Sequence, residues 1–145
     1  MRTRPYLSLD DVKTIAVAAE AEALKNGWAV TIAICDDGGH LLWLHRLDGC
    51  PPISASIAPE KARTAALGRR PSKAYEDVIN NGRTAFLSAP LQGMLEGGET
   101  IVIDRHTIGA VGVSGVKSAE DAQIARAGIA ALVAALAEFG GVAAS

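Results

Sequence analysis

The segment Gly97-Gly98-Glu99 places two glycines before a carboxylate at the start of an expected strand. Successive glycines can direct backbone N–H groups at an anion or oxyanion. A partly desolvated glutamate can act as a general base. A plain turn with Glu99 in solvent is the more common use of paired glycines and stays open. Gly97 and Gly98 are therefore candidate ligand-binding residues, and Glu99 is a candidate catalytic base.

Arg46 and Asp48 lie at the end of an expected strand, just before a proline-rich loop. A guanidinium can hold a carboxylate through two parallel hydrogen bonds, and loops at strand ends often carry function. An Arg–Asp pair that only shapes the loop is an equally open interpretation. Both residues are candidate ligand-binding groups.

The chain has three histidines, and His45 is the best acid–base candidate because it precedes Arg46. His40 lies five residues earlier on the same strand, so the two rings point to opposite faces. His106 is expected in a turn. No two histidines have the spacing of metal ligands on a helix, so no metal site is predicted. A structural or solvent-exposed role remains the alternative for each ring.

Lys61 lies among small apolar residues near the start of an expected helix. It could neutralise an anionic ligand, or form a Schiff base if it is buried. The alternative is an exposed lysine paired with Glu60 or another neighbour.

Composition narrows the class of protein. The chain has 145 residues, 49% of them apolar, which suits a single domain spanning 1–145. A net charge of -2 without a block of like charge argues against nucleic-acid binding. No apolar run is long enough to span a bilayer, and the basic start lacks the apolar core of an export signal. Only Cys35 and Cys50 are present, which is no disulfide framework, so we expect a cytoplasmic protein.

Periodicity predicts the elements that position these residues. Apolar spacing and a Ser8 cap predict a helix from Leu9 to about Asn26. Alternation predicts a hairpin with strands at 28–35 and 40–47, in which Val30, Ile32 and Ile34 share one face. Helices are expected at 57–67, because Pro59 belongs in a first turn, and from about Ser72 to Asn81.

The second half of the chain repeats the hairpin-and-helix pattern. A short strand is possible near 91–95, and strands at 99–104 and 107–114 flank a turn at Arg105-His106. Ser118, with Asp121 three residues later, predicts a capped helix to about Phe139. Gly109, Gly112 and Gly115 predict that this last helix packs closely on the closing strand. Antiparallel pairing with helices segregated from the strands gives an α+β layer fold.

The chain resembles the haem-binding/glycolate-operon family, of GlcG/HbpS type, which includes the C-terminal domain of the propanediol-operon cobalamin adenosyltransferase. The segments that carry the similarity extend over nearly the whole chain: VTIAICDDGG at 30–39, RLDG at 46–49, SIAPEKARTAA at 56–66, Gly97-Gly98, IGAVGVSG at 108–115, and Asp121 with Ile124-Ala125.

This resemblance implies a profilin-like α+β fold with a five-stranded antiparallel sheet flanked by helices, and a homo-oligomer. Some relatives bind haem or corrinoid-related ligands, and many belong to catabolic gene clusters. Haem-binding relatives tend to carry a histidine early in the chain, whereas the first histidine here is His40. The family also has an apolar residue and proline after the paired glycines, where this chain has Glu99-Thr100.

Three functions follow as hypotheses. The first is an oligomeric protein that binds haem, another tetrapyrrole or an anionic metabolite. The second is a cofactor-independent isomerase, hydrolase or deaminase that acts on a small carboxylate, with Glu99 or His45 as the base. The third is an accessory oligomer without a ligand.

Overall fold

The computed structural model describes residues 1–139 of the chain. In chain order the elements are α1 (Leu9–Lys25), β1 (Thr31–Asp36), β2 (Leu41–Arg46), α2 (Ser54–Gly68), α3 (Lys73–Asn80), the 3-10 helix η1 (Thr84–Ser88), β3 (Gly98–Ile103), β4 (His106–Ser114) and α4 (Ser118–Glu138). The expected sequence of helix, hairpin, two helices, hairpin and helix is therefore confirmed.

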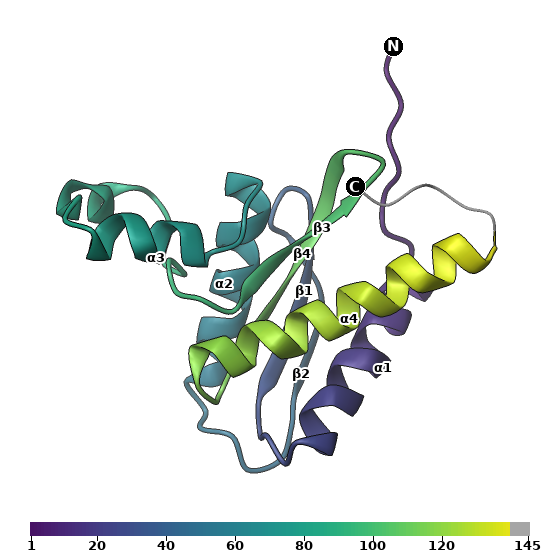
Figure 1. Cartoon of the computed structure of the whole chain (residues 1–145), viewed down its shortest axis with the longest axis horizontal. Coiled ribbons are helices and arrows are strands. Elements are labelled where there is room, and N and C mark those ends of the chain that lie inside the picture. Colours follow the sequence, from purple (N-terminus) through teal and green to yellow (C-terminus); the bar gives the residue numbers. More distant parts are fainter. Residues whose placement is uncertain (140–145) are drawn as a thin grey trace.

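The four strands form one antiparallel sheet in the order β2-β1-β4-β3. Helices α1 and α4 pack on each other over one face, and α2 covers the other face (Figure 1). The expected arrangement of an antiparallel sheet flanked by helices is therefore confirmed. The pair α3 and η1 projects from the body at the end of α2 (Figure 1).

The two faces of the sheet carry side chains of different size. On the α1/α4 face, Ile32, Ile34 and Val111 belong to a cluster of large buried residues. On the α2 face, Cys35 and Ala110 pack against alanines of α2. The predicted alternation of β1 is confirmed, and the small side chains explain why α2 can lie so close to the sheet.

Glycines bring the backbone of α2 into contact with β3 and β4. A Cβ at Gly112 would lie 2.1 Å from the carbonyl oxygen of Ala58, and one at Gly98 would lie 2.2 Å from that of Lys61. The prediction that α4 packs on the glycines of β4 is wrong, because Gly112 faces α2. The small residue that matters in α4 is Gly128, where a Cβ would lie 2.9 Å from Ile15 of α1.

Two helix starts differ from the prediction. Helix α2 begins at Ser54 instead of Ile57, because its first N–H groups bond three residues back and form a tight first turn ahead of Pro59. Lys117 instead of Ser118 caps α4, and its N–H donates to the Glu120 carboxylate at 3.3 Å.

The sheet has four strands in the described part of the chain, so the expected five-stranded sheet is wrong. The segment at 91–95 is irregular, with bends at Gln92 and Leu95, and forms no strand. A Cβ at Gly93 would lie 2.2 Å from the backbone of Glu60, so this segment packs on α2 and not along a sheet edge. The last turn also shifts by one residue, because Asp104 and Arg105 take the left-handed conformation and His106 starts β4.

Helix α4 ends at Glu138, next to the predicted end at about Phe139, and Phe139 is 84% exposed. None of the helices within residues 1–139 combines the length and apolar character that a bilayer crossing requires.

Candidate functional site

A surface cavity of about 400 Å³ lies where the end of α1 meets the end of β2. Three of the candidate residues from the sequence, His45, Arg46 and Asp48, line this cavity together with mostly apolar neighbours. The full lining is Leu24, Gly27, Trp28, Ala29, His45, Arg46, Leu47 and Asp48. The size lies within the range of small-molecule sites in proteins.

Local backbone structure brings these two segments together. Gly27 has φ of 70° and ends α1, as its sequence position predicts. The N–H of Trp28 donates to Ala23, which turns the chain back toward β1. Thr31 then pairs with Arg46 across the hairpin, so both segments meet at the same end of the sheet.

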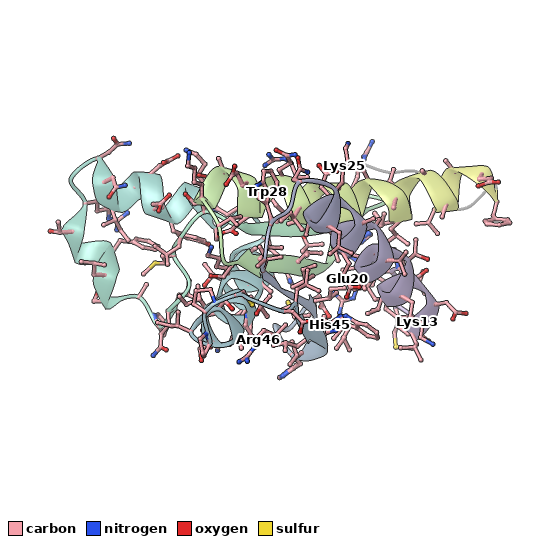
Figure 2. The ribbon with its side chains drawn as sticks, turned by 90° about the horizontal axis from the view of Figure 1, so that it is seen from below. Lys13, Glu20, Lys25, Trp28, His45 and Arg46 are labelled. Carbon is pink, nitrogen blue, oxygen red and sulfur yellow. The ribbon has the colours of Figure 1, made fainter. Side chains whose placement is uncertain are left out.

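The His45 ring is oriented by a carboxylate from α1. Its Nδ1 atom contacts Glu20 Oε1 in a short hydrogen bond, and Figure 2 shows the two side chains meeting from α1 and β2. The His45 side chain is 54% exposed. A carboxylate on Nδ1 favours the tautomer with the proton on Nδ1, which leaves Nε2 able to accept a proton or a metal.

Arg46 and Asp48 bring unpaired charges to the cavity. Neither side chain forms an ion pair or hydrogen bond with another residue within 1–139, so the open alternative of an Arg46–Asp48 pair does not describe this structure. Trp28 is half-buried and adds an aromatic surface to the same lining. A cavity lined by both a guanidinium and an aromatic ring suits a ligand with both an anionic group and an apolar body.

Lys61 lies elsewhere and is almost fully buried, at 4% exposure. Its Nζ donates to Asp121 Oδ2 and to the Val113 carbonyl, both at 3.0 Å. The other carboxylate oxygen of Asp121 accepts the Val116 N–H. Burial raises the pKa of Asp121, and the Lys61 charge and the Val116 N–H oppose that rise. The alternative of an exposed Lys61 paired with Glu60 does not describe this structure, and the lysine joins α2 to the start of α4.

Gly97 and Gly98 lie directly over Lys61. A Cβ at Gly97 would lie 2.8 Å from the Lys61 Nζ. The N–H of Gly98 donates to the Ser72 hydroxyl at 2.8 Å, and its carbonyl accepts the Ser72 N–H at 2.9 Å. In this structure the glycine pair provides close packing around the buried ion pair.

Glu99 forms an ion pair with Arg126 of α4, at 2.8 Å. Its side chain is 13% exposed. Burial raises the pKa of Glu99, while the hydrogen bond and charge of Arg126 oppose the rise. Glu99 is absent from the lining of the cavity that contains His45.

The structure therefore divides the sequence candidates into two groups. His45, Arg46 and Asp48 share the cavity, whereas Gly97 packs against Lys61 of α2 and neither residue lines it. Sequence reasoning missed Glu20, which lies 25 residues from His45. It also missed Trp28, an aromatic residue directly after the glycine that ends α1.

No cluster of three or more His, Cys, Asp or Glu side chains within residues 1–139 has the arrangement of a metal site.

Comparison with known proteins agrees with this architecture. Residues 7–130 match the family model described as "Haem degrading protein HbpS-like". The chain belongs to the HbpS-like family. It is 58% identical over 114 residues to Protein GlcG of Escherichia coli K12, which covers 79% of this chain and 85% of GlcG.

Two solved structures have the same fold. The PduOC:Heme complex superposes with a TM-score of 0.80 at 29% identity, over 88% of this chain and 95% of that one. A double mutant of HbpS from Streptomyces reticuli has the same TM-score and identity, over 90% of this chain and 89% of its own. The resemblance seen in the sequence is confirmed.

Proposed function

We propose that this HbpS-like chain binds an anionic ligand, haem or a related tetrapyrrole in the first instance, in the cavity between α1 and β2. The observation that supports the proposal most directly is the Arg46 guanidinium, which has no protein partner within residues 1–139 and lines the same cavity as Trp28. A carboxylate held by Arg46 would leave the rest of the ligand against the aromatic ring.

The residues of the cavity fit haem. The Nε2 atom of His45 is the side of the ring not used by Glu20, and a histidine with a carboxylate on its other nitrogen is a common metal ligand. Arg46 would hold a propionate, and Leu24, Trp28 and Leu47 would contact the macrocycle. Bound haem would supply an iron centre whose reactivity depends on its axial ligand and surroundings.

Relatives support haem as the first ligand to test. The name of the matching family refers to haem degradation, and PduOC was solved as a haem complex. The early histidine of haem-binding relatives is absent here, and His45 at the end of β2 takes its place in the proposal.

Haem titration of the purified chain tests the proposal. We expect a saturable Soret band that shifts or weakens on His45→Ala. His40→Ala is the matched control, because His40 is an exposed histidine that precedes the same strand and does not line the cavity. Arg46→Ala should weaken binding about tenfold, the usual effect of losing one charged hydrogen bond.

An unchanged Soret band in both His45→Ala and Arg46→Ala would reject this site. If haem does not bind at all, the same variants can be tested with small carboxylates by calorimetry. Loss of carboxylate binding on Arg46→Ala alone would then identify an anionic metabolite as the ligand.

A second candidate function is cofactor-independent proton transfer on a small carboxylate. The specific observation is the Glu20–His45 contact, because a carboxylate that orients an imidazole is the usual arrangement of a general base. Arg46 would hold the substrate carboxylate, and Asp48 would accept a hydrogen bond from a substrate hydroxyl. Glu99 is the less suitable candidate for the base because its carboxylate already forms an ion pair with Arg126.

Proton exchange into deuterated hydroxy and keto acids, followed by NMR, tests this enzyme function. Loss of exchange in His45→Ala and retention in Glu99→Gln is expected. The reverse result would assign the base to Glu99.

We also propose that the chain forms a homo-oligomer through β2. This strand lies at a free sheet edge and exposes Leu41, Leu42 and Leu44 at 53%, 43% and 39%. Exposed apolar edge strands invite pairing with another chain. Light scattering should give a multiple of 15.0 kDa, reduced by Leu42→Lys with Leu44→Lys. A monomer at micromolar concentration would contradict it.

We also propose that the protein acts in the cytoplasm and in catabolism. Cys35 and Cys50 are both free thiols, which suits a reducing cytoplasm. We place the ligand in catabolism because the resemblance is to catabolic-operon proteins, and growth of a deletion strain on single carbon sources tests this placement.

A further inference from the structure

A second cavity, of about 510 Å³, lies at the opposite end of the sheet from His45. It is formed by the N-terminal segment, the end of α2 and the β3–β4 turn, and Figure 1 shows the N-terminal segment running past that turn. Its lining is strongly basic: Arg4, Arg69, Val102, Arg105, His106 and Thr107.

Two of the arginines are held side by side by one acid. Arg4 Nη2 lies 2.5 Å from Asp37 Oδ2, and Arg69 Nη2 lies 3.7 Å from the same oxygen. Arg69 Nη1 also donates to the Asp37 carbonyl at 2.5 Å and to the Ala66 carbonyl at 2.9 Å. The guanidiniums therefore have fixed positions while their side chains remain 48% exposed.

The other side of the cavity adds an arginine and a histidine. Arg105 has a left-handed backbone, with φ of 65°, in the β3–β4 turn. The Nδ1 atom of His106 donates to the Asp104 carbonyl at 2.8 Å, since a carbonyl oxygen can only accept. The ring is therefore oriented, and its Nε2 becomes a second donor when it is protonated.

Arg4 and Arg69 bring two positive charges to this cavity, and both pair with the single Asp37 carboxylate. Arg105 also lines the cavity, and residues 1–139 contribute no acid to the lining. The whole chain carries a net charge of -2, so this local excess runs against the overall balance. Grouped guanidiniums of this kind recognise phosphoryl and carboxylate oxygens through paired N–H donors.

We infer that this cavity, lined by Arg4, Arg69 and Arg105, is a second ligand site, for a small molecule that carries two or more phosphoryl or carboxylate groups. The site is independent of the proposed haem cavity. One strand length separates them, roughly 16 Å at the rise of an extended strand. Asp37 keeps Arg4 and Arg69 in position. Its carboxylate also competes with the ligand for these two arginines, which limits the affinity of the site for the ligand.

Calorimetric titration with inorganic pyrophosphate, and separately with citrate, tests the inference and distinguishes a phosphoryl from a carboxylate ligand. We expect saturable 1:1 binding that weakens as salt is raised. Arg4→Ala should weaken it about tenfold. Arg105→Asn should do the same, and asparagine tolerates the left-handed turn. Arg2→Ala is the matched control, because Arg2 is an exposed arginine of the same segment and does not line the cavity.

Asp37→Asn separates a ligand site from a clamp that only anchors the N-terminal segment. Removal of the competing charge should tighten pyrophosphate or citrate binding at least threefold if the arginines form a ligand site. A purely structural clamp predicts no binding in either protein, and that result overturns the inference. Equal weakening by Arg2→Ala and Arg4→Ala would also overturn it, because it would show general charge attraction. Haem binding at His45 is unaffected in either case.

Discussion

Replacement of Lys61 by methionine tests whether the buried ion pair is structural. Methionine keeps an apolar stem of similar length and removes the ammonium that contacts Asp121 and the Val113 carbonyl. The Asp121 carboxylate is then left at 2% exposure with only the Val116 N–H as a partner among the described residues.

The size of the effect follows from that unpaired charge. Loss of one partner of a buried ion pair costs about 3–5 kcal/mol of unfolding free energy. For a domain of this size that corresponds to a fall in Tm of about 10–15 °C. Lys61→Met combined with Asp121→Asn removes both charges and should recover most of the loss.

The pH dependence gives a second signature. Burial already raises the pKa of Asp121 above 3.8, so the folded state holds this proton more tightly than the unfolded state. The resulting stabilisation of the fold is greatest below pH 3.8 and falls as pH rises through the folded-state pKa of Asp121. Without Lys61 the opposing charge is gone and the pKa rises further. The difference between Lys61→Met and the natural chain should therefore be small near pH 4 and largest at pH 7.

Urea unfolding followed by circular dichroism, at fixed protein concentration between pH 4 and 7, measures both effects. A loss below about 1 kcal/mol that does not change with pH would refute the reasoning. In that case Lys61 would not be fixed by Asp121 and would be available to a ligand, as its sequence position first suggested.

Three further predictions follow from particular contacts. Gly112→Ala should destabilise the fold by about 1–3 kcal/mol in urea unfolding, because its Cβ would meet the α2 backbone, whereas Gly38→Ala in an exposed turn should have little effect. Burial raises the pKa of Glu99, so ionisation of Glu99 lowers the stability of the natural chain as pH rises above 4.5. Glu99→Gln should make stability depend less on pH in that range, and an identical pH profile would contradict this. Burial raises the pKa of Cys35 to about 12, so mass spectrometry should find Cys35 unmodified by iodoacetamide at pH 8 until the chain is unfolded.

The sequence predicted most of the secondary structure because periodicity is a local signal. The alternation of Val30, Ile32 and Ile34 identified the face of β1 that packs under α1 and α4. Ser8 and Asp11 form the expected cap of α1 through reciprocal hydrogen bonds. These features depend on neighbours a few residues apart.

The errors concern contacts between distant segments. Glycine spacing showed that a helix lies close to β4, but it could not show that α2, and not α4, covers Gly112. The burial of Lys61 depends on Asp121, 60 residues away, and apolar neighbours alone did not reveal that partner. The expected fifth strand failed because the 91–95 segment packs on α2.

The candidate site was predicted in part for the same reason. His45, Arg46 and Asp48 are adjacent in the chain and so reach one cavity together. Glu20, which orients His45, comes from α1 and is found only when the helix is placed over the sheet.

The location of bound haem tests the central claim most directly, and paramagnetic broadening in proton–nitrogen NMR spectra reports it. We predict selective loss of the Trp28 indole signal and of the amides at 45–48 when ferric haem is added, with the signals around Arg4 and Arg105 retained. Broadening centred on the β3–β4 turn, or none at equimolar haem, would contradict the account.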